Sequence, residues 1–185
     1  MRKFFSLAAV TAATIIPAAH SFGTTTQPYS LLLRGGDGPN DIAVDFAPSD
    51  KTKYLIAANG TLPPVATCTN PPGKTTELEC PVADISGFTV RTRGGNDTVT
   101  VGKTVPVSTI LNGGLGLDDL IGGANTDGIS GGDGDDKLVG RMGADQLFGG
   151  KGEDLLVGGA GKDVLRGGPG TDVLRDGPGR DDVRQ

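Results

Sequence analysis

Large aromatic side chains are almost missing from this sequence of 185 residues. It contains no Trp, 2 Tyr and 6 Phe, and aromatic residues make up 4% of the chain. Because aromatic residues supply much of the buried area in conventional cores, this composition excludes a globular core built on bulky side chains. We therefore expect the fold to be held together by something other than side-chain bulk.

Histidine is also nearly absent, since His20 is the only one. His20 lies in an N-terminal segment that we expect to be cleaved off, so the mature chain lacks the side chain that a Ser-His-Asp triad or an H-E-x-x-H zinc site requires. We therefore expect no enzyme. A pair of carboxylates that hydrolyses a sugar stays open as an alternative, although few aromatic rings are present to stack on a sugar.

Cysteine occurs only twice, as Cys68 and Cys80 in the stretch CTNPPGKTTELEC. Two thiolates are too few for a structural metal site. The PPGKTT within this stretch fails the phosphate-binding pattern G-x-x-x-x-G-K-[ST], because Cys68 stands where the first Gly is required. In an exported protein an isolated pair is most simply a disulfide, the alternative being two free thiols. We predict a bond between Cys68 and Cys80 that closes a short Pro/Gly loop.

Long apolar runs are missing after the first 21 residues. The basic residues Arg2 and Lys3 are followed by an apolar stretch from Leu7 to Ile16 and by a small-residue exit. This pattern indicates a secretory signal peptide over residues 1–21. The alternative, a membrane anchor, needs about 20 apolar residues, roughly twice this stretch. We expect a secreted, extracellular protein without a membrane span.

The charge of the chain is unevenly distributed. The formal net charge is -5, and the part from Gly113 onward carries 14 acidic and 8 basic residues, against 8 acidic and 9 basic before it. An acidic C-terminal part argues against nucleic acid as a partner and favours cations.

Glycine, by contrast, is abundant, with 32 residues, and much of it follows a period of nine. From Gly113 the chain divides into eight blocks without insertion: GGLGLDDLI, GGANTDGIS, GGDGDDKLV, GRMGADQLF, GGKGEDLLV, GGAGKDVLR, GGPGTDVLR and DGPGRDDVR. Every block but the second, which has Asn125, has Gly fourth. The sixth residues are Asp118, Asp127, Asp136, Asp145, Asp154, Asp163, Asp172 and Asp181. The eighth residues are Leu120, Ile129, Leu138, Leu147, Leu156, Leu165, Leu174 and Val183.

Each position of the block has a physical interpretation. Gly at the first four positions permits the left-handed backbone of a tight turn and lets main-chain carbonyl oxygens converge. The sixth residue adds a carboxylate oxygen, and ligation by carboxylates and carbonyls alone favours Ca²⁺ over zinc or copper. The last three residues predict a short strand with one inward aliphatic side chain. Stacked copies then form a continuous apolar seam.

Two other interpretations explain the blocks less well. A disordered Gly/Asp linker has no reason to keep an aliphatic residue at one phase. An EF-hand loop fails because Lys137 interrupts its pattern when that pattern starts at Asp133.

The blocks resemble the RTX, or hemolysin-type, calcium-binding nonapeptide repeat, G-G-x-G-x-D-x-U-x. The resemblance covers residues 113–184 and implies an all-β fold, a parallel β-roll (a β-solenoid) in which two nonapeptides form one coil. Odd and even blocks would then line opposite edges, with several Ca²⁺ ions, about six at most, between loops one coil apart. Block two, block four with Arg141 for Gly, and the last block with Asp176 depart from the motif. The implied metal ligands are the eight sixth-position aspartates with Gly114, Gly116, Gly132, Gly134, Gly150, Gly152, Gly159, Gly161, Gly168 and Gly170.

Residues 22–112 are rich in Thr and Val and alternate in polarity, which predicts short strands. Two stretches keep the phase of the repeat: RGGNDTV, with Asp97 sixth, and GGDGPNDIA, with Asn40 in place of the Asp. We interpret this part as a degenerate, strand-rich extension of the same solenoid, stapled by the two cysteines where calcium no longer ties the coils. The layout resembles small secreted bacterial proteins with a Cys-containing β region before hemolysin-type repeats.

Three hypotheses for function follow. The leading one is a secreted calcium-binding β-roll that folds when it meets Ca²⁺. The second is a calcium-rigidified adhesion module for a cell-surface polysaccharide or protein, and the third is a small carbohydrate-active enzyme. The ninth residue of the block changes from apolar to Arg in Arg166, Arg175 and Arg184, which blunts the end of the roll, so we expect a monomer.

Overall fold

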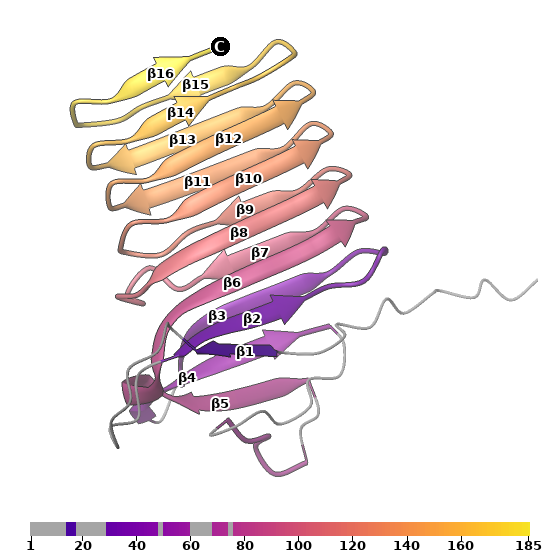
Figure 1. Ribbon diagram of the computed structural model, residues 1–185, viewed down its shortest axis with the longest axis vertical. Helices are drawn as coiled ribbons and strands as arrows, with labels where there is room; N and C mark the ends of the chain where they lie inside the picture. Colours follow the sequence, from indigo (N-terminus) through magenta and orange to yellow (C-terminus); the bar gives the residue numbers. More distant parts are fainter. Residues whose placement is uncertain (1–13, 18–28, 48–49, 60–67, 74–75) are drawn as a thin grey trace, which may run out of the picture.

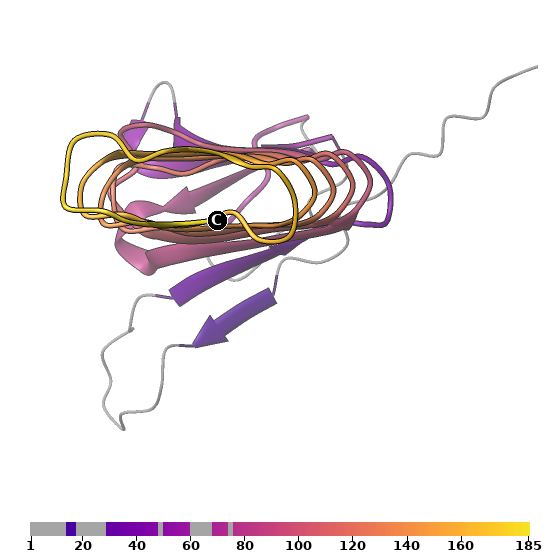
Figure 2. The same ribbon diagram turned by 90° about the horizontal axis from the view of Figure 1, so that it is seen from above.

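The computed structural model describes residues 14–17, 29–47, 50–59, 68–73 and 76–185. Among these residues the chain forms sixteen strands and one short 3-10 turn, η1 (Val82–Asp84). The strands make two sheets that lie face to face and wind upward as a flattened coil (Figures 1 and 2). The fold is a parallel β-solenoid, as the resemblance to the nonapeptide repeat implies.

Each sheet contains eight strands. In order across the first, sheet A, these are β1 (Thr14–Pro17), β2 (Tyr29–Arg34), β6 (Ile85–Gly94), β8 (Ser108–Leu115), β10 (Gly128–Asp133), β12 (Gln146–Lys151), β14 (Val164–Arg166) and β16 (Asp182–Arg184). In the second, sheet B, they are β15 (Val173–Arg175), β13 (Leu155–Ala160), β11 (Lys137–Met142), β9 (Asp119–Ile121), β7 (Thr98–Val101), β3 (Asp41–Ala47), β4 (Asp50–Ala58) and β5 (Glu77–Pro81).

In the repeat region two blocks form one coil. Strand β10 pairs in parallel with β12, so that Ile129 lies beside Leu147, and β11 pairs in the same way with β13, so that Leu138 lies beside Leu156. Strands β10 to β13 are longer than predicted: each runs from the end of one block into the first residues of the next. The extra residues pair because the loops of successive coils superpose closely enough to continue the ladder.

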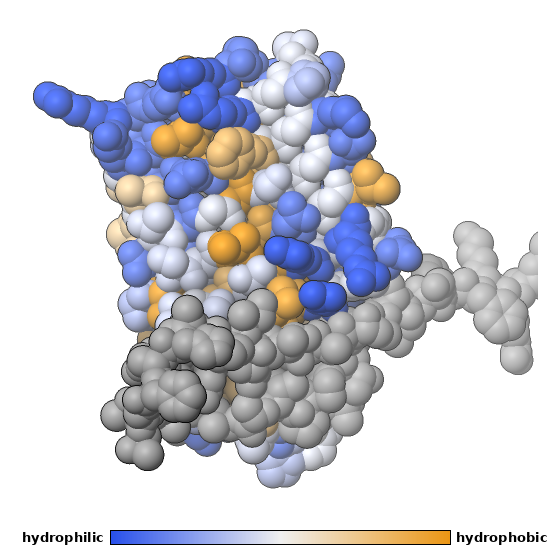
Figure 3. Space-filling view, viewed as in Figure 1, coloured by the Kyte–Doolittle hydropathy of each residue, from blue (hydrophilic) through white to orange (hydrophobic). Residues whose placement is uncertain are grey.

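The eighth-position aliphatic residues form the seam between the sheets. Six of them are at most 1% exposed, whereas Leu174 is partly buried and Val183 is 40% exposed. Val183 departs from the expected inward position because β16 is the last strand of sheet A and sheet B ends one strand earlier, at β15. The face of the roll seen in Figure 3 is mainly polar with small apolar patches. The buried residues are Leu120, Ile129, Leu138, Leu147, Leu156 and Leu165.

The N-terminal extension continues the solenoid only in part. Strands β2, β6 and β8 pair in parallel in sheet A, and β3, β7 and β9 do so in sheet B. Strands β4 and β5 instead pair antiparallel and extend sheet B beyond β3. This part of the extension is therefore a cap on the solenoid and not a degenerate coil, since alternating polarity predicts strands but not the direction in which they pair.

The largest side chains of the core pack between the cap and the adjoining strands β3 and β6, and the disulfide lies in the cap. The ring of Tyr54 stacks on Phe46 at 5.3 Å between centroids and meets the edge of Phe88 at 5.2 Å. Cys68 and Cys80 are bonded, as predicted, and both are buried. Where the repeats have one aliphatic residue per block, the cap thus has an aromatic cluster and a covalent link.

The expected signal peptide lies largely outside the described residues. Within it only β1 is described, and it pairs antiparallel with β2 at the edge of sheet A. In the part of the chain that the structure describes, no helix is long and apolar enough to cross a bilayer.

Candidate metal sites

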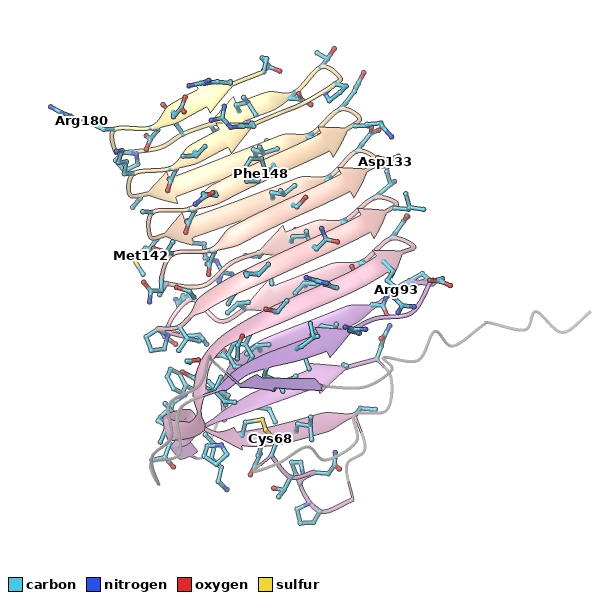
Figure 4. All side chains as sticks on the ribbon, in the orientation of Figure 1. Cys68, Arg93, Asp133, Met142, Phe148 and Arg180 are labelled. Atoms are coloured by element: carbon cyan, nitrogen blue, oxygen red, sulfur yellow. A yellow bond between two sulfur atoms is a disulfide. The ribbon has the colours of Figure 1, made fainter. Side chains whose placement is uncertain are left out.

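The loops that join the two sheets form two edges. Loops of odd blocks lie on one edge, where Arg93 and Asp133 are labelled, and loops of even blocks lie on the other, where Met142 and Arg180 are labelled (Figure 4). The sixth-position aspartates therefore fall into two columns. The odd column runs Asp118, Asp136, Asp154, Asp172, and the even column runs Asp127, Asp145, Asp163, Asp181.

Within each column one oxygen of every carboxylate accepts a hydrogen bond from the coil below. The backbone N–H of Asp118 donates to Oδ1 of Asp136 at 2.9 Å, and that of Asp136 donates to Oδ1 of Asp154 at 2.8 Å. The even column repeats this arrangement, with the N–H of Asp145 donating to Oδ1 of Asp163 at 2.9 Å. The partners are 18 residues apart, so each hydrogen bond links two successive coils.

The second carboxylate oxygen of most column aspartates is buried without a donor. The sixth-position aspartates are at most 8% exposed, except Asp181, which is half-buried. Leaving a buried charged oxygen without a hydrogen bond is costly, so each of these atoms needs a positive partner. The unpaired oxygens are Oδ2 of Asp97, Asp118, Asp136, Asp145, Asp154, Asp163 and Asp172.

A carbonyl oxygen of the next coil lies close to this carboxylate oxygen. A Cβ placed on Gly149, the first residue of its block, would overlap Oδ2 of Asp154 and lie 2.7 Å from the carbonyl oxygen of Gly167. The same pair of oxygens surrounds Gly140, with Asp145 and Gly158 as their sources. First-position glycines therefore make room for converging oxygens.

Glycines at the second and fourth positions serve a different purpose. Gly132 and Gly134 have φ angles of 127° and 140°, which favour glycine. A Cβ on either would also overlap the carbonyl oxygen of the equivalent residue one coil below, Gly114 or Gly116. The expectation of left-handed backbone is thus met at these two positions but not at the first, where space for the carboxylate is the requirement.

Burial raises the pKa of six sixth-position aspartates, which belong to both columns. Burial raises the pKa of Asp118 to about 6, although the hydrogen bond from the N–H of Asp97 opposes this. It raises the pKa of Asp136 and of Asp145 to about 7, and aspartates one coil away add to the effect by repulsion. The pKa is raised by burial also in Asp127, Asp154 and Asp163. Without a cation these columns hold carboxyl groups that resist ionisation near neutral pH.

The donor set fits a hard divalent cation. Each place offers carboxylate and carbonyl oxygens, the donors that Ca²⁺ selects. Within the described residues no three His, Cys, Asp or Glu side chains converge on one point. A bound ion would therefore take its remaining ligands from main-chain carbonyls, which is what the glycine loops expose.

The comparison with family models agrees with this geometry. The model of the RTX calcium-binding nonapeptide repeat matches residues 122–156 and, in an overlapping match, 139–174. Residues 122–174 therefore belong to the RTX calcium-binding nonapeptide repeat family. RTX repeats bind calcium, which supports calcium binding by this β-roll. No curated protein and no solved structure matches the chain.

The RTX segment departs from its own pattern at block two. Among the described residues of block two, neither Gly123 nor Asn125 has a positive φ angle. Oδ2 of Asp127 also differs from the other sixth-position oxygens, because the N–H of Gly123 donates to it at 2.7 Å. Asp127 is therefore in the even column but in a more fully hydrogen-bonded place than Asp145 or Asp163.

Sequence reasoning left Asp97 out of the candidate ligands, although its phase was visible. Asp97 is 1% exposed, its N–H donates to Oδ1 of Asp118 at 2.9 Å, and its Oδ2 has no donor. The odd column thus extends below the repeat, into the extension, as far as Asp97. The next residue below Asp97 is Asn40, whose N–H and side-chain amide both donate to Oδ1 of Asp97, at 2.7 and 2.9 Å.

The stacked hydrogen bonds predict that the aspartates of one column contribute unequally to calcium binding. Asp154→Asn keeps an oxygen for the N–H of Asp136 but removes the charge of a carboxylate that is 1% exposed, whereas Asp181→Asn changes a half-buried end residue. We expect Asp154→Asn to lose at least one bound ion and Asp181→Asn to lose less, measured by equilibrium dialysis. Asp133→Asn is the control, because its exposed carboxylate pairs with Lys151 at 2.8 Å. Equal losses from Asp154→Asn and Asp181→Asn would contradict the stacked arrangement.

The raised pKa values predict an inverted pH dependence without calcium. A carboxyl whose pKa is higher in the folded than in the unfolded chain binds more protons when folded, so the fold gains stability as pH falls. The gain begins at the raised pKa values of about 6 to 7 of Asp118, Asp136 and Asp145, and is lost as pH rises through them. In excess chelator we expect the β signal in circular dichroism to increase as the pH falls from about 8 to about 5, because protonation favours the folded segment. A β signal that decreases over this range would contradict the assignment.

Proposed function

We propose that this protein is a secreted calcium-binding β-roll whose RTX segment folds when calcium binds. The observation that supports the proposal is the set of buried Oδ2 atoms without donors, each aspartate being held in the ladder by its other oxygen. A cation shared between neighbouring loops would supply the missing partner. The disulfide between Cys68 and Cys80 supports export to an oxidising compartment.

The ions would lie in two columns, one at each edge. In the proposed assignment the carboxylates come from the eight sixth-position aspartates and from Asp97, with Asp127 and Asp181 the weakest. The carbonyls come from the glycine loops, including the second- and fourth-position residues expected from the motif and first-position residues such as Gly158 and Gly167. Bound calcium supplies positive charge between coils, and the chain supplies its oxygens at fixed spacing.

Calcium binding would then be linked to folding. Ordering a residue costs about 1 to 2 kcal/mol, and fully burying one aliphatic side chain returns about 1.5 to 3 kcal/mol, so one such residue per block cannot order nine. Removing the repulsion between stacked carboxylates gives calcium a large share of the remaining stability. Extracellular calcium modules bind at about 0.1 to 1 mM, which would leave the segment unfolded before export and folded after it.

The proposed organisation has three parts. Residues 1–21 are the signal peptide, residues 22–112 carry the disulfide-bonded cap and the first coils, and residues 113–184 form the calcium-dependent array. We propose no catalytic activity, in keeping with the repeat family, which is typically non-catalytic.

Calcium titration followed by circular dichroism tests this function. We expect the mature protein in chelator to lack much of its β signal and to gain it cooperatively as calcium is added, because neighbouring coils stabilise one another. Magnesium should have little effect, since its small octahedral shell fits carbonyl-rich loops poorly. A spectrum and a melting curve that chelator leaves unchanged would overturn calcium-driven folding.

A groove on the outer face of sheet A favours a second candidate function, the binding of a polysaccharide. The groove is lined by Phe148 and Ile110 beside the polar side chains of Arg91, Asn112 and Gln146. Phe148 and Ile110 are 39% and 55% exposed, and Phe148 lies mid-way up the roll (Figure 4). An aromatic ring next to amide and guanidinium donors is suited to a sugar, with its apolar face and its hydroxyl groups.

A glycan array probed with and without calcium tests this candidate. We expect calcium-dependent binding that Phe148→Ala weakens, with Val173→Ala, at an exposed apolar residue of sheet B, as the control outside the groove. Absence of binding in both conditions would leave calcium binding as the function of the roll alone.

A further inference from the structure

Arg141 occupies a glycine position in the even edge. It is the second residue of block four, and its φ angle is 82°, in the left-handed region that disfavours a side chain. Such a conformation costs of the order of 1 to 3 kcal/mol and persists only where the surroundings offset it. The side chain of Arg141 must therefore make contacts that glycine could not.

The side chain of Arg141 contacts residues of the two coils below it. One guanidinium nitrogen, Nη1, donates to the carbonyl oxygen of Gly122 at 2.8 Å and also to the carbonyl oxygen of Val101. Gly122 is the first residue of block two. In a coil above on the same edge, the equivalent carbonyl of Gly158 lies near the unpaired Oδ2 of Asp145.

Below Gly122 the aspartate column has ended. The residue one coil below Asp127 is Thr109, whose N–H and hydroxyl both donate to Oδ1 of Asp127, at 2.8 and 2.7 Å. Between the loop of Thr109 and the loop of Asp127, the carbonyl oxygens of Gly122 and Val101 converge on the guanidinium. The lower loop supplies no carboxylate there. A divalent ion there would lack one of its two charged ligands.

The charges around the guanidinium are those expected for a bound cation. Burial lowers the pKa of Arg141, and the negative charges of Asp127 and Asp45 oppose this shift. The positive charge in turn acts on Asp127, opposing the rise in pKa that burial causes there. Within the ladder, Asp127 is also the aspartate whose Oδ2 receives the N–H of Gly123.

We infer that the guanidinium of Arg141 is a resident cation that takes the place of calcium at the N-terminal end of the even edge. This inference rests on the proposed calcium function and adds a boundary to it. The odd column can take ions from Asp97 upward, whereas the even column begins above Asp127. The coils around Val101 and Gly122 are then held by the chain itself in the absence of calcium.

Arg141→Gly tests the inference, and Arg93→Gly is its matched control. Arg93 is also an arginine in a second position, with φ of 78°, but it is exposed and lies on the other edge. Both substitutions relieve the same backbone strain, so neither should prevent folding. The measurements are the number of calcium ions bound per chain, by equilibrium dialysis with calcium alone, and the melting temperature in chelator.

At a calcium concentration high enough to fill a site with a single carboxylate ligand, we expect Arg141→Gly to bind one more calcium ion per chain than wild type, and in chelator we expect it to melt at a lower temperature than Arg93→Gly. Arg141→Lys should keep the wild-type number of ions, because it keeps the positive charge. If Arg141→Gly and Arg93→Gly bind the same number of ions, the inference is wrong, whatever their melting temperatures. If wild type binds no calcium, the proposed function itself fails, which is a separate outcome.

Discussion

The stacking of one aspartate carboxylate above another at each edge is the interaction on which the rest of the structure depends. One oxygen of each carboxylate accepts the N–H of the aspartate a coil below, which holds the loops at a spacing of 18 residues. The same arrangement buries a second oxygen without a donor and brings like charges together. The contact that sets the register is therefore also a source of instability, and a cation between the loops relieves it.

The remaining features of the repeat follow from this spacing. Coils this close leave no room for a Cβ where carbonyl oxygens of one loop meet the Cα atoms of the next, hence the glycines at Gly132, Gly134, Gly150 and Gly152. The narrow space between the sheets accepts one aliphatic residue per block, such as Leu138 or Leu147, and no aromatic cluster. The large rings of Tyr54 and Phe88 meet where strand β4 of the cap packs against β6, the strand below Thr109 in sheet A.

Much of this could be predicted from the period of nine. An aliphatic residue at one phase predicted the seam, and Asp at another predicted the columns, because in a regular coil the period determines which residues share an edge. The period could not show what single residues do where it breaks. Asp97 joins the odd column although it is 21 residues from Asp118, because the three additional residues lie elsewhere in that coil. The role of the first-position glycines was likewise missed, since a carboxylate filling the place of a Cβ is a tertiary contact with no local signal.

The ends of the two columns show how the chain limits a stack of like charges. An interior carboxylate such as Asp136 has one N–H donor and two carboxylate neighbours, so its charge is poorly compensated. At the N-terminal ends the next residues are neutral donors: Asn40 gives two hydrogen bonds to Asp97, and Thr109 gives two to Asp127. These donors stabilise a carboxylate without adding a charge that would need a further ion. Each column can therefore stop before the cap, where the disulfide and the aromatic cluster provide the stability that we propose ions give in the repeats.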